Sequence, residues 1–151
     1  IQTPWLYDWL GQPYKTQDLV RRAMLRLYAP TPFGMPGNDD GGTMSAWWVF
    51  GALGLYPATP GTDTLVLNGP LFPSALVTTP HGHLTISATA AADARPYVQE
   101  VSADGRRLKH TWLSARSLMN GDHHMAFTLA ARPNDTWGST PAAAPPSQSS
   151  R

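Results

Sequence analysis

The stretch PGNDDGGTMSAWWVF, residues 36–50, places two adjacent acids among glycines, directly before an apolar segment that contains two tryptophans. The apolar segment predicts a helix from about Thr43 to Leu53, which ends at Gly54 because glycine suits the left-handed conformation that follows a helix. This helix is apolar almost all round, and such helices are buried. The stretch therefore predicts a helix in the interior of a folded protein, with an acidic turn at its start.

The two acids of this turn, Asp39 and Asp40, lie where the free N–H groups of a helix start and the positive end of its dipole favour ionised carboxylates. A carboxyl that stays deprotonated near neutral pH suits a general base or a hydroxyl-binding group better than a general acid. The flanking glycines let the backbone approach a ligand closely. The alternative is that the acids only cap the helix, and local chemistry by itself favours this alternative.

A second helix is predicted upstream, from about Gln17 to Tyr28, with Thr16 as its cap. Its apolar residues recur at spacings of three and four, and arginines occupy the other face: Leu19, Val20, Ala23, Met24 and Leu27 against Arg21, Arg22 and Arg26. The prolines at positions 30 and 32 end it. Because two helices of this kind cannot bury one another completely, they are expected to pack against helices outside this chain.

The hydrophobic period changes from helical to alternating after the turn at 57–61. Larger apolar residues alternate with polar or small ones at 84–89 and at 125–130, and this pattern predicts two strands with one buried face. The pair Asp104-Gly105 predicts a hairpin turn. The chain is thus expected to be α+β, with helices in residues 1–60 and a β-rich unit in residues 61–138. Residues 139–151 lack core-forming side chains and are expected to be a disordered tail or a linker.

The composition excludes several function classes. Eleven basic residues against ten acidic ones leave the chain near neutral, so neither nucleic acid nor a membrane is an expected partner. The longest apolar run is too short to cross a bilayer, and the lack of cysteine excludes disulfides and thiolate metal sites. The chain opens on IQTPWLYDWL, without an initiator Met or a signal-like segment, and is interpreted as the interior of a longer protein.

Several segments resemble, in the same order, one known enzyme family. PGNDDGGTMSAWWVFGALGLYPATPG is similar to the signature of glycoside hydrolase family 92, the calcium-dependent exo-acting α-mannosidases. PWLYDWLGQPYKTQDLVR looks like the family's form Pro-Tyr-Leu-Tyr-Asn-(aromatic)-x-Gly-Gln-Pro. The string NGPLFP at 68–73, the Tyr97-Val98-Gln99 strand and the pattern Pro-Asn-x-x-Trp-Gly at 133–138 also fit. The resemblance extends from residue 3 to residue 138.

The resemblance implies a fold and a reaction. Family members have a β-sandwich domain followed by an (α/α)6 barrel, so this chain would be an α+β fragment: the last helices of the barrel followed by a C-terminal β-rich subdomain. They hydrolyse terminal α-mannosides with inversion, which makes an α-mannoside or an N-glycan the expected substrate, with an α-1,2 linkage slightly favoured. The resemblance also implies a secreted or extracytoplasmic enzyme of bacterial type.

The resemblance assigns roles to the acidic turn. Asp40 matches the catalytic general base. Asn38 falls where many members carry an additional acid, and its amide would orient the attacking water, whereas Asp39 would be a structural or assisting acid. Calcium is the implied cofactor, but its ligands and the general acid, a Glu, are expected upstream of Ile1, with no metal ligand within this chain. The upstream part of the same polypeptide is then a required partner, and the isolated chain is expected to be inactive.

Other residues have simpler interpretations. His81 with His83, and His123 with His124, form two pairs that lack a third metal ligand in the sequence, so solvated loop histidines are favoured over a zinc site. The tryptophans of the buried helix are expected in the core rather than against a sugar. The alternative function is an autonomous carbohydrate-binding or interaction module, in which the β-rich unit binds a ligand and the acids only cap a helix.

Overall fold

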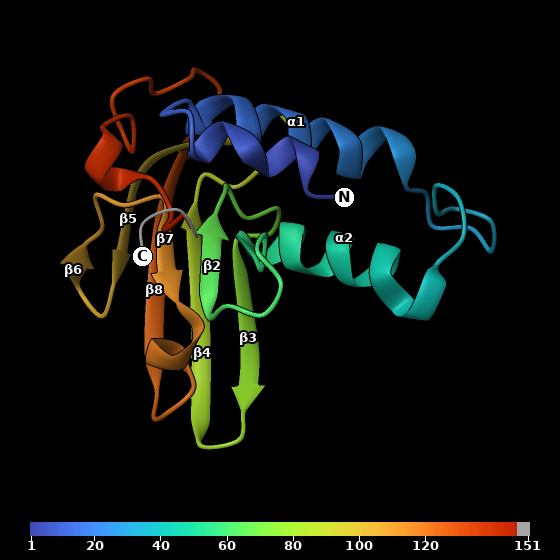
Figure 1. The fold of residues 1–151 in the computed structure, drawn as a ribbon. Helices are drawn as coiled ribbons and strands as arrows, with labels where there is room; N and C mark the ends of the chain where they lie inside the picture. The colour runs from blue at the N-terminus through green and yellow to red at the C-terminus, as the bar shows by residue number, and fades with distance from the viewer. Residues whose placement is uncertain (148–151) are drawn as a thin grey trace.

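The computed structural model describes residues 1–147 and contains a helical layer along one end of two β-sheets (Figure 1). The helical layer consists of a 3-10 helix, Thr3–Asp8, followed by α1 (Pro13–Leu27) and α2 (Thr43–Leu53). The strands are β1 (Leu55–Tyr56), β2 (Thr64–Leu67), β3 (Ser74–Thr79), β4 (Gly82–Thr89), β5 (Tyr97–Ala103), β6 (Arg106–Arg107), β7 (Trp112–Ser114) and β8 (His123–Ala130). Short 3-10 turns lie at Asp40–Gly42, Ala115–Leu118 and Pro141–Ala143. The predicted α+β class is confirmed.

Helix α1 begins earlier than predicted, at Pro13. Proline suits the first position of a helix because the N–H that it lacks would have no partner there. Thr16 was expected as the cap and is instead buried within the helix, so that prediction was wrong. Arg21 was expected on the outer polar face, but it is only 3% exposed. Both errors arise because α1 packs against the β-rich unit on a face that its own sequence does not mark as apolar.

Helix α2 has the predicted bounds, and Gly54 ends it with φ at 82°. A Cβ at Gly54 would lie 2.8 Å from the carbonyl oxygen of Asn68, so a larger residue does not fit. Burial is one-sided, since Trp47 is 5% exposed whereas Val49 is 51% exposed. Within this chain the helix is therefore not buried all round, although its apolar sequence predicted that it would be, and one of its faces is exposed.

Eight strands within residues 1–147 form two sheets. One contains β3, β4, β8, β5 and β6 in this order, and the other contains β1, β2 and β7. The pairing of β4 with β8 is parallel, and the other neighbours are antiparallel. The two strands predicted from alternation are confirmed as β4 and β8. The predicted hairpin is also confirmed, because Asp104 at φ 49° and Gly105 at φ 76° make the turn between β5 and β6.

In the part of the chain that the structure describes, two clusters of buried side chains form the core. The larger one lies against the five-stranded sheet and includes Ile86 and Phe127, with Phe50 of α2 packed against it. The smaller cluster is aromatic and joins the helical layer to β1, where Trp5 stacks on Tyr56 with ring centroids 4.4 Å apart. The prediction that helix tryptophans belong to the core holds for Trp47, whereas Trp48 is only half-buried.

Buried hydrogen bonds join α1 to the β-rich unit. The Arg21 guanidinium donates to the carbonyl oxygens of Gly69 at 3.1 Å and Pro70 at 2.7 Å. Gln17 Oε1 accepts the N–H of Val98, in β5, at 3.0 Å. The helices and the strands thus share a polar junction as well as apolar contacts, and a domain boundary at residue 60 stays a prediction.

Residues 139–147 differ from the disordered tail or linker that the sequence predicts. Pro141–Ala143 forms a 3-10 turn, Ala143 is 3% exposed, and its carbonyl oxygen accepts the N–H of Thr111 at 3.0 Å. This segment packs through small side chains and backbone groups, which leave no hydrophobic period in the sequence. The rest of the predicted tail, residues 148–151, lies outside the described residues.

Candidate active site

The loop before α2 carries the three residues that the sequence analysis selected, Asn38, Asp39 and Asp40. It ends in two consecutive glycines with positive φ, Gly41 at 60° and Gly42 at 80°. Residues with a side chain rarely adopt these angles. Gly42 is the N-cap position of α2. The paired glycines turn the chain so that the side chain of Asp39 reaches forward to the first turn of α2.

Asp39 is the acid that caps α2. Its Oδ1 accepts the N–H groups of Met44 at 2.8 Å and Ser45 at 2.9 Å, and its Oδ2 accepts the Ser45 hydroxyl at 2.6 Å. The Ser45 hydroxyl, assisted by the backbone N–H groups, lowers the pKa of Asp39 below its ordinary value. Asp39 is therefore ionised at neutral pH, and both of its carboxylate oxygens hold the helix start.

Asp40 is exposed, and its carboxylate has no hydrogen-bond or ion-pair partner among residues 1–147. Its backbone is held, because its carbonyl oxygen accepts the Thr43 hydroxyl at 2.7 Å. Asn38 is also exposed, and its amide has no partner in the same part of the chain. The fold thus separates two adjacent acids into one that holds a helix and one that is free. The catalytic roles of Asn38, Asp39 and Asp40 stay predictions.

An apolar hollow of about 450 Å³ lies between the C-terminal half of α1 and the first turns of α2. Tyr28, Ser45 and Trp48 are among the residues that line it. Tyr28 donates its hydroxyl to the carbonyl oxygen of Met44 at 3.0 Å, and burial, followed by the charge of Asp39, raises the pKa of Tyr28. In this chain the surface beside the acidic loop is therefore largely apolar.

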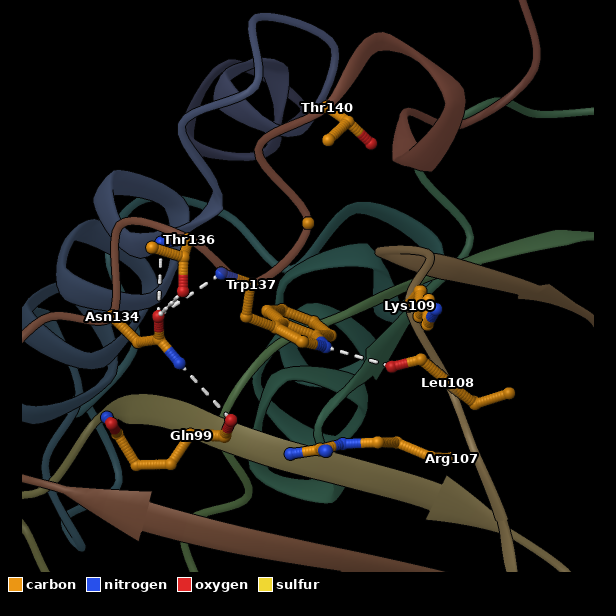
Figure 2. Close-up of a pocket in the computed structure, with 9 residues that line it drawn as sticks. Gln99, Arg107, Leu108, Lys109, Asn134, Thr136, Trp137 and Thr140 are labelled. Carbon is orange, nitrogen blue, oxygen red and sulfur yellow. Dashed lines mark hydrogen bonds between the residues drawn. The ribbon is translucent and has the colours of Figure 1, made fainter.

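A second hollow, of about 290 Å³, lies beside β5 and β6 and is lined in part by residues 134–140 (Figure 2). Asn134 bridges its walls: Oδ1 accepts the N–H of Trp137 at 3.2 Å, and Nδ2 donates to the Gln99 carbonyl oxygen at 3.2 Å. Trp137 is 8% exposed and donates its ring N–H to the Leu108 carbonyl oxygen at 3.1 Å. Because this ring is buried, it is not open for stacking on a sugar. The hollow gives no support to an autonomous sugar-binding module.

Two histidines of the β-rich unit, His83 and His123, pair with acids. His123 Nδ1 lies 2.8 Å from Asp104 Oδ2, and this bond raises the pKa of His123. His83 Nδ1 lies 3.2 Å from Asp122 Oδ1. Among the residues that the structure describes, no group of three or more His, Asp or Glu side chains is placed to hold a metal ion. These pairs connect neighbouring loops and strand ends.

Comparison with known proteins bears on these observations. The sequence profile of the glycosyl hydrolase family 92 catalytic domain matches residues 1–131. The chain belongs to glycoside hydrolase family 92. The structure of a family 92 α-mannosidase from Bacteroides thetaiotaomicron has a TM-score of 0.92 at 28% identity over 97% of this chain. A family 92 inverting mannosidase from B. thetaiotaomicron VPI-5482 has a TM-score of 0.90 at 34% identity over 98% of this chain.

A curated relative is described as an uncharacterized secreted glycosidase of the fungus Arthroderma benhamiae, and it is 26% identical over 94% of this chain. All three relatives are much longer. This chain covers 20% of each of the two Bacteroides mannosidases and 19% of the Arthroderma protein. It thus spans about a fifth of the length of its family 92 relatives. No helix within residues 1–147 is long and apolar enough to span a bilayer.

The structure also contains a buried carboxyl that sequence reasoning missed. Asp8 stands where the family 92 form quoted above has Asn, and this departure was the available signal. It is 0% exposed, and neither carboxyl oxygen has a hydrogen-bond partner of good geometry among the described residues. Burial raises the pKa of Asp8 well above its ordinary value, and the hydroxyls of Thr16 and Thr111 offset only part of this rise. Because Asp8 is sealed from solvent, its effect falls on stability rather than on chemistry.

Asp8→Asn is expected to raise stability at neutral pH and to flatten its pH dependence. The folded-state pKa of Asp8 lies above the unfolded value of about 3.9, so the folded state holds the proton more tightly. The contribution of Asp8 to the free energy of unfolding is therefore most favourable below about pH 4, where the carboxyl is protonated in both states. It declines as the pH rises toward the folded-state pKa, by up to about 1.4 kcal/mol per pH unit. Urea unfolding at several pH values measures the free energy of unfolding of the variant and the wild type. If this free energy depends on pH in the same way in both proteins, Asp8 is not a neutral buried carboxyl.

Proposed function

We propose that this chain is the C-terminal segment of an inverting, calcium-dependent exo-α-mannosidase, to which it contributes the general base, Asp40. The observation that carries the proposal is the 34% identity and TM-score of 0.90 to the family 92 inverting mannosidase over 98% of this chain. The unpartnered carboxylate of Asp40 is the feature of the chain that suits this reaction.

An inverting glycosidase needs two carboxyl groups on opposite faces of the scissile bond, about 6.5–9.5 Å apart. One protonates the leaving oxygen, and the other removes a proton from the water that attacks the anomeric carbon. Asp40 suits the second role, because a base must be ionised and must present a free oxygen to the water. Asn38 would orient this water, and Asp39 would assist by holding the loop. We place the general acid, a Glu, in the part of the polypeptide upstream of this chain, as the family resemblance implies.

The architecture of the complete enzyme is part of the same proposal. Large apolar side chains are exposed along the helical layer, including Leu25, Leu27 and Val49. They support a division in which residues 1–60 are the last helices of an (α/α)6 barrel and residues 61–138 are a C-terminal β-rich subdomain. Upstream helices of the same polypeptide would cover the apolar surface. The isolated chain would then lack the general acid and most of the sugar pocket, and it would be inactive.

The proposed substrate is a terminal α-mannoside, free or on an N-glycan, with a preference for the α-1,2 linkage. The family 92 α-mannosidase from B. thetaiotaomicron in complex with mannoimidazole supports a ligand of this kind. The description of the Arthroderma relative as a secreted glycosidase supports an extracytoplasmic location. The bacterial type of the enzyme rests on the family resemblance.

Calcium is the proposed cofactor, although the described residues do not fit it. This ion takes six to eight oxygen ligands, and no cluster of three acids or histidines is present among residues 1–147. We place its ligands upstream of this chain, as the family resemblance implies. A chelator should abolish the activity of the full-length enzyme, and added calcium should restore it. Calorimetry on the 151-residue chain should show no tight calcium binding, and tight binding would move the ligands into this chain.

The proposal is tested by assaying the full-length protein on an aryl α-mannoside and on α-linked mannobioses, with calcium present. Proton NMR of the first-formed mannose distinguishes the two stereochemical outcomes. Release of β-mannose supports inversion, whereas release of α-mannose contradicts it. A folded, calcium-loaded enzyme that hydrolyses none of these α-mannosides would overturn the proposed function.

A further inference from the structure

We propose that Ser45 is a positioning residue, which acts through Asp39 to hold the loop that carries Asp40 in its catalytic orientation. The inference rests on the proposed function of Asp40 as the general base. Ser45 lies in the first turn of α2 and contacts the acidic loop directly through its hydroxyl.

The Ser45 hydroxyl has two acceptors within reach but only one proton. Its Oγ lies 2.6 Å from Asp39 Oδ2 and 3.2 Å from the carbonyl oxygen of Gly42. The shorter bond, to a charged acceptor, is the stronger one. Ser45 thus completes a set of three hydrogen bonds on the Asp39 carboxylate, the other two coming from the backbone N–H groups of Met44 and Ser45. This set fixes Asp39 against the helix.

Packing does not confine the glycines that flank the two acids. A Cβ built at Gly37 or at Gly41 would meet nothing within 4 Å, so no neighbouring group confines the glycines on either side of the acids. Glycine adopts many conformations where nothing confines it. Two backbone bonds close the turn, from Gly42 N–H to the Asp39 carbonyl oxygen at 2.9 Å and from Thr43 N–H to the Asp40 carbonyl oxygen. Side chains add two further anchors: Asp39 on the helix start, and the Thr43 hydroxyl on the Asp40 carbonyl oxygen at 2.7 Å.

The helix turn to which Asp39 is bonded is itself anchored. Tyr28 of the α1–α2 connection donates to the Met44 carbonyl oxygen at 3.0 Å, and Trp47 is 5% exposed in the core. A fixed reference of this kind matters because a displacement of about 1 Å at a reacting group costs about 10²-fold in rate. Since a general base acts in the transition state, its misplacement lowers kcat more than it weakens substrate binding.

The test is Ser45→Ala in the full-length enzyme, beside Ser45→Thr, which keeps a hydroxyl, and Ser102→Ala in β5 as a control. Ser45→Ala is expected to lower kcat about 10- to 100-fold and to change KM less than about threefold. Ser45→Thr should restore most of kcat, and Ser102→Ala should leave it unchanged. Unchanged kcat in Ser45→Ala, or equal damage from Ser45→Thr, would overturn the proposal.

Asp39→Asn provides a second variant that does not depend on the folding of Ser45→Ala. It removes the charged acceptor of the Ser45 hydroxyl, and it is expected to lower kcat at least as much as Ser45→Ala. If Ser45 acts through Asp39, the double variant should lose no more kcat than Asp39→Asn alone. Unchanged kcat in Asp39→Asn, or losses that multiply in the double variant, would overturn the proposal.

Asp40→Asn separates this inference from the function on which it rests. An inactive Asp40→Asn enzyme together with a fully active Ser45→Ala enzyme would remove the positioning role and leave the base assignment intact. An active Asp40→Asn enzyme would remove the base assignment itself.

Discussion

Asp40→Asn in the full-length enzyme is expected to lower kcat by about 10³-fold or more while leaving the fold intact. Asparagine keeps the size and shape of the side chain but cannot accept the proton of the attacking water. Folding should not suffer, because the Asp40 carboxylate is exposed and has no partner among the residues that the structure describes. Steady-state kinetics on an aryl α-mannoside measure the loss, and circular dichroism checks the fold.

Two matched variants control this experiment. Asp39→Asn should lower kcat less than Asp40→Asn, because Asp39 supports the loop and does not take the proton. Asp135→Asn changes an exposed acid of the β-rich unit and should have no effect. Near-normal turnover by a folded Asp40→Asn enzyme would dispose of the base assignment. Equal losses from the Asp39 and Asp40 variants would contradict the division of roles between the two acids.

Arg21→Met is expected to lower the free energy of unfolding by about 3 kcal/mol. The guanidinium is buried and donates to the carbonyl oxygens of Gly69, Pro70 and Ala92. Methionine fills much of the same volume but removes the charged donor from all three carbonyl oxygens, at a cost of about 1 kcal/mol or more each. Because the acceptors lie in two loops of the β-rich unit, the loss should loosen the junction between α1 and the strands.

Arg22→Met is the matched control, since Arg22 is the next residue of the same helix. It is exposed, and its ion pair with Asp18, at 2.7 Å, lies on the surface. Such pairs contribute little, so the expected change is below about 0.5 kcal/mol. Urea unfolding followed by tryptophan fluorescence measures both variants against the wild type. Similar losses from the two arginines would contradict the junction assigned to Arg21.

Elements that depend only on near neighbours in the chain were predictable. The bounds of α2 follow from an apolar run that stops at Gly54, where the left-handed conformation suits glycine. The turn at Asp104 and Gly105 follows from the same steric rule. Alternation located β4 and β8 because one face of each strand is buried. In each case the conformation is determined by residues that are adjacent in the sequence.

Elements that depend on distant partners were not predictable. Arg21 and Arg22 are adjacent and chemically alike, yet only Arg21 faces the carbonyl oxygens of the loops around Gly69 and Ala92. Thr16 was predicted to be a helix cap from its residue type alone. Its actual place, buried within α1, depends on how that helix packs against distant residues. Residues 139–147 looked featureless because their contacts are made by small side chains and backbone groups.

The candidate site divides in the same way. The sequence by itself determined the family, the pair of acids before α2 and the glycines around them, since these depend only on the order of residues. The tertiary structure decided which acid caps the helix: the turn at Gly41 and Gly42 brings Asp39 to the N–H groups of Met44 and Ser45 and leaves Asp40 free. The physical reason is that a hydrogen bond needs its donor and acceptor within about 3 Å. Only the folded backbone determines which of two neighbouring carboxylates meets that condition.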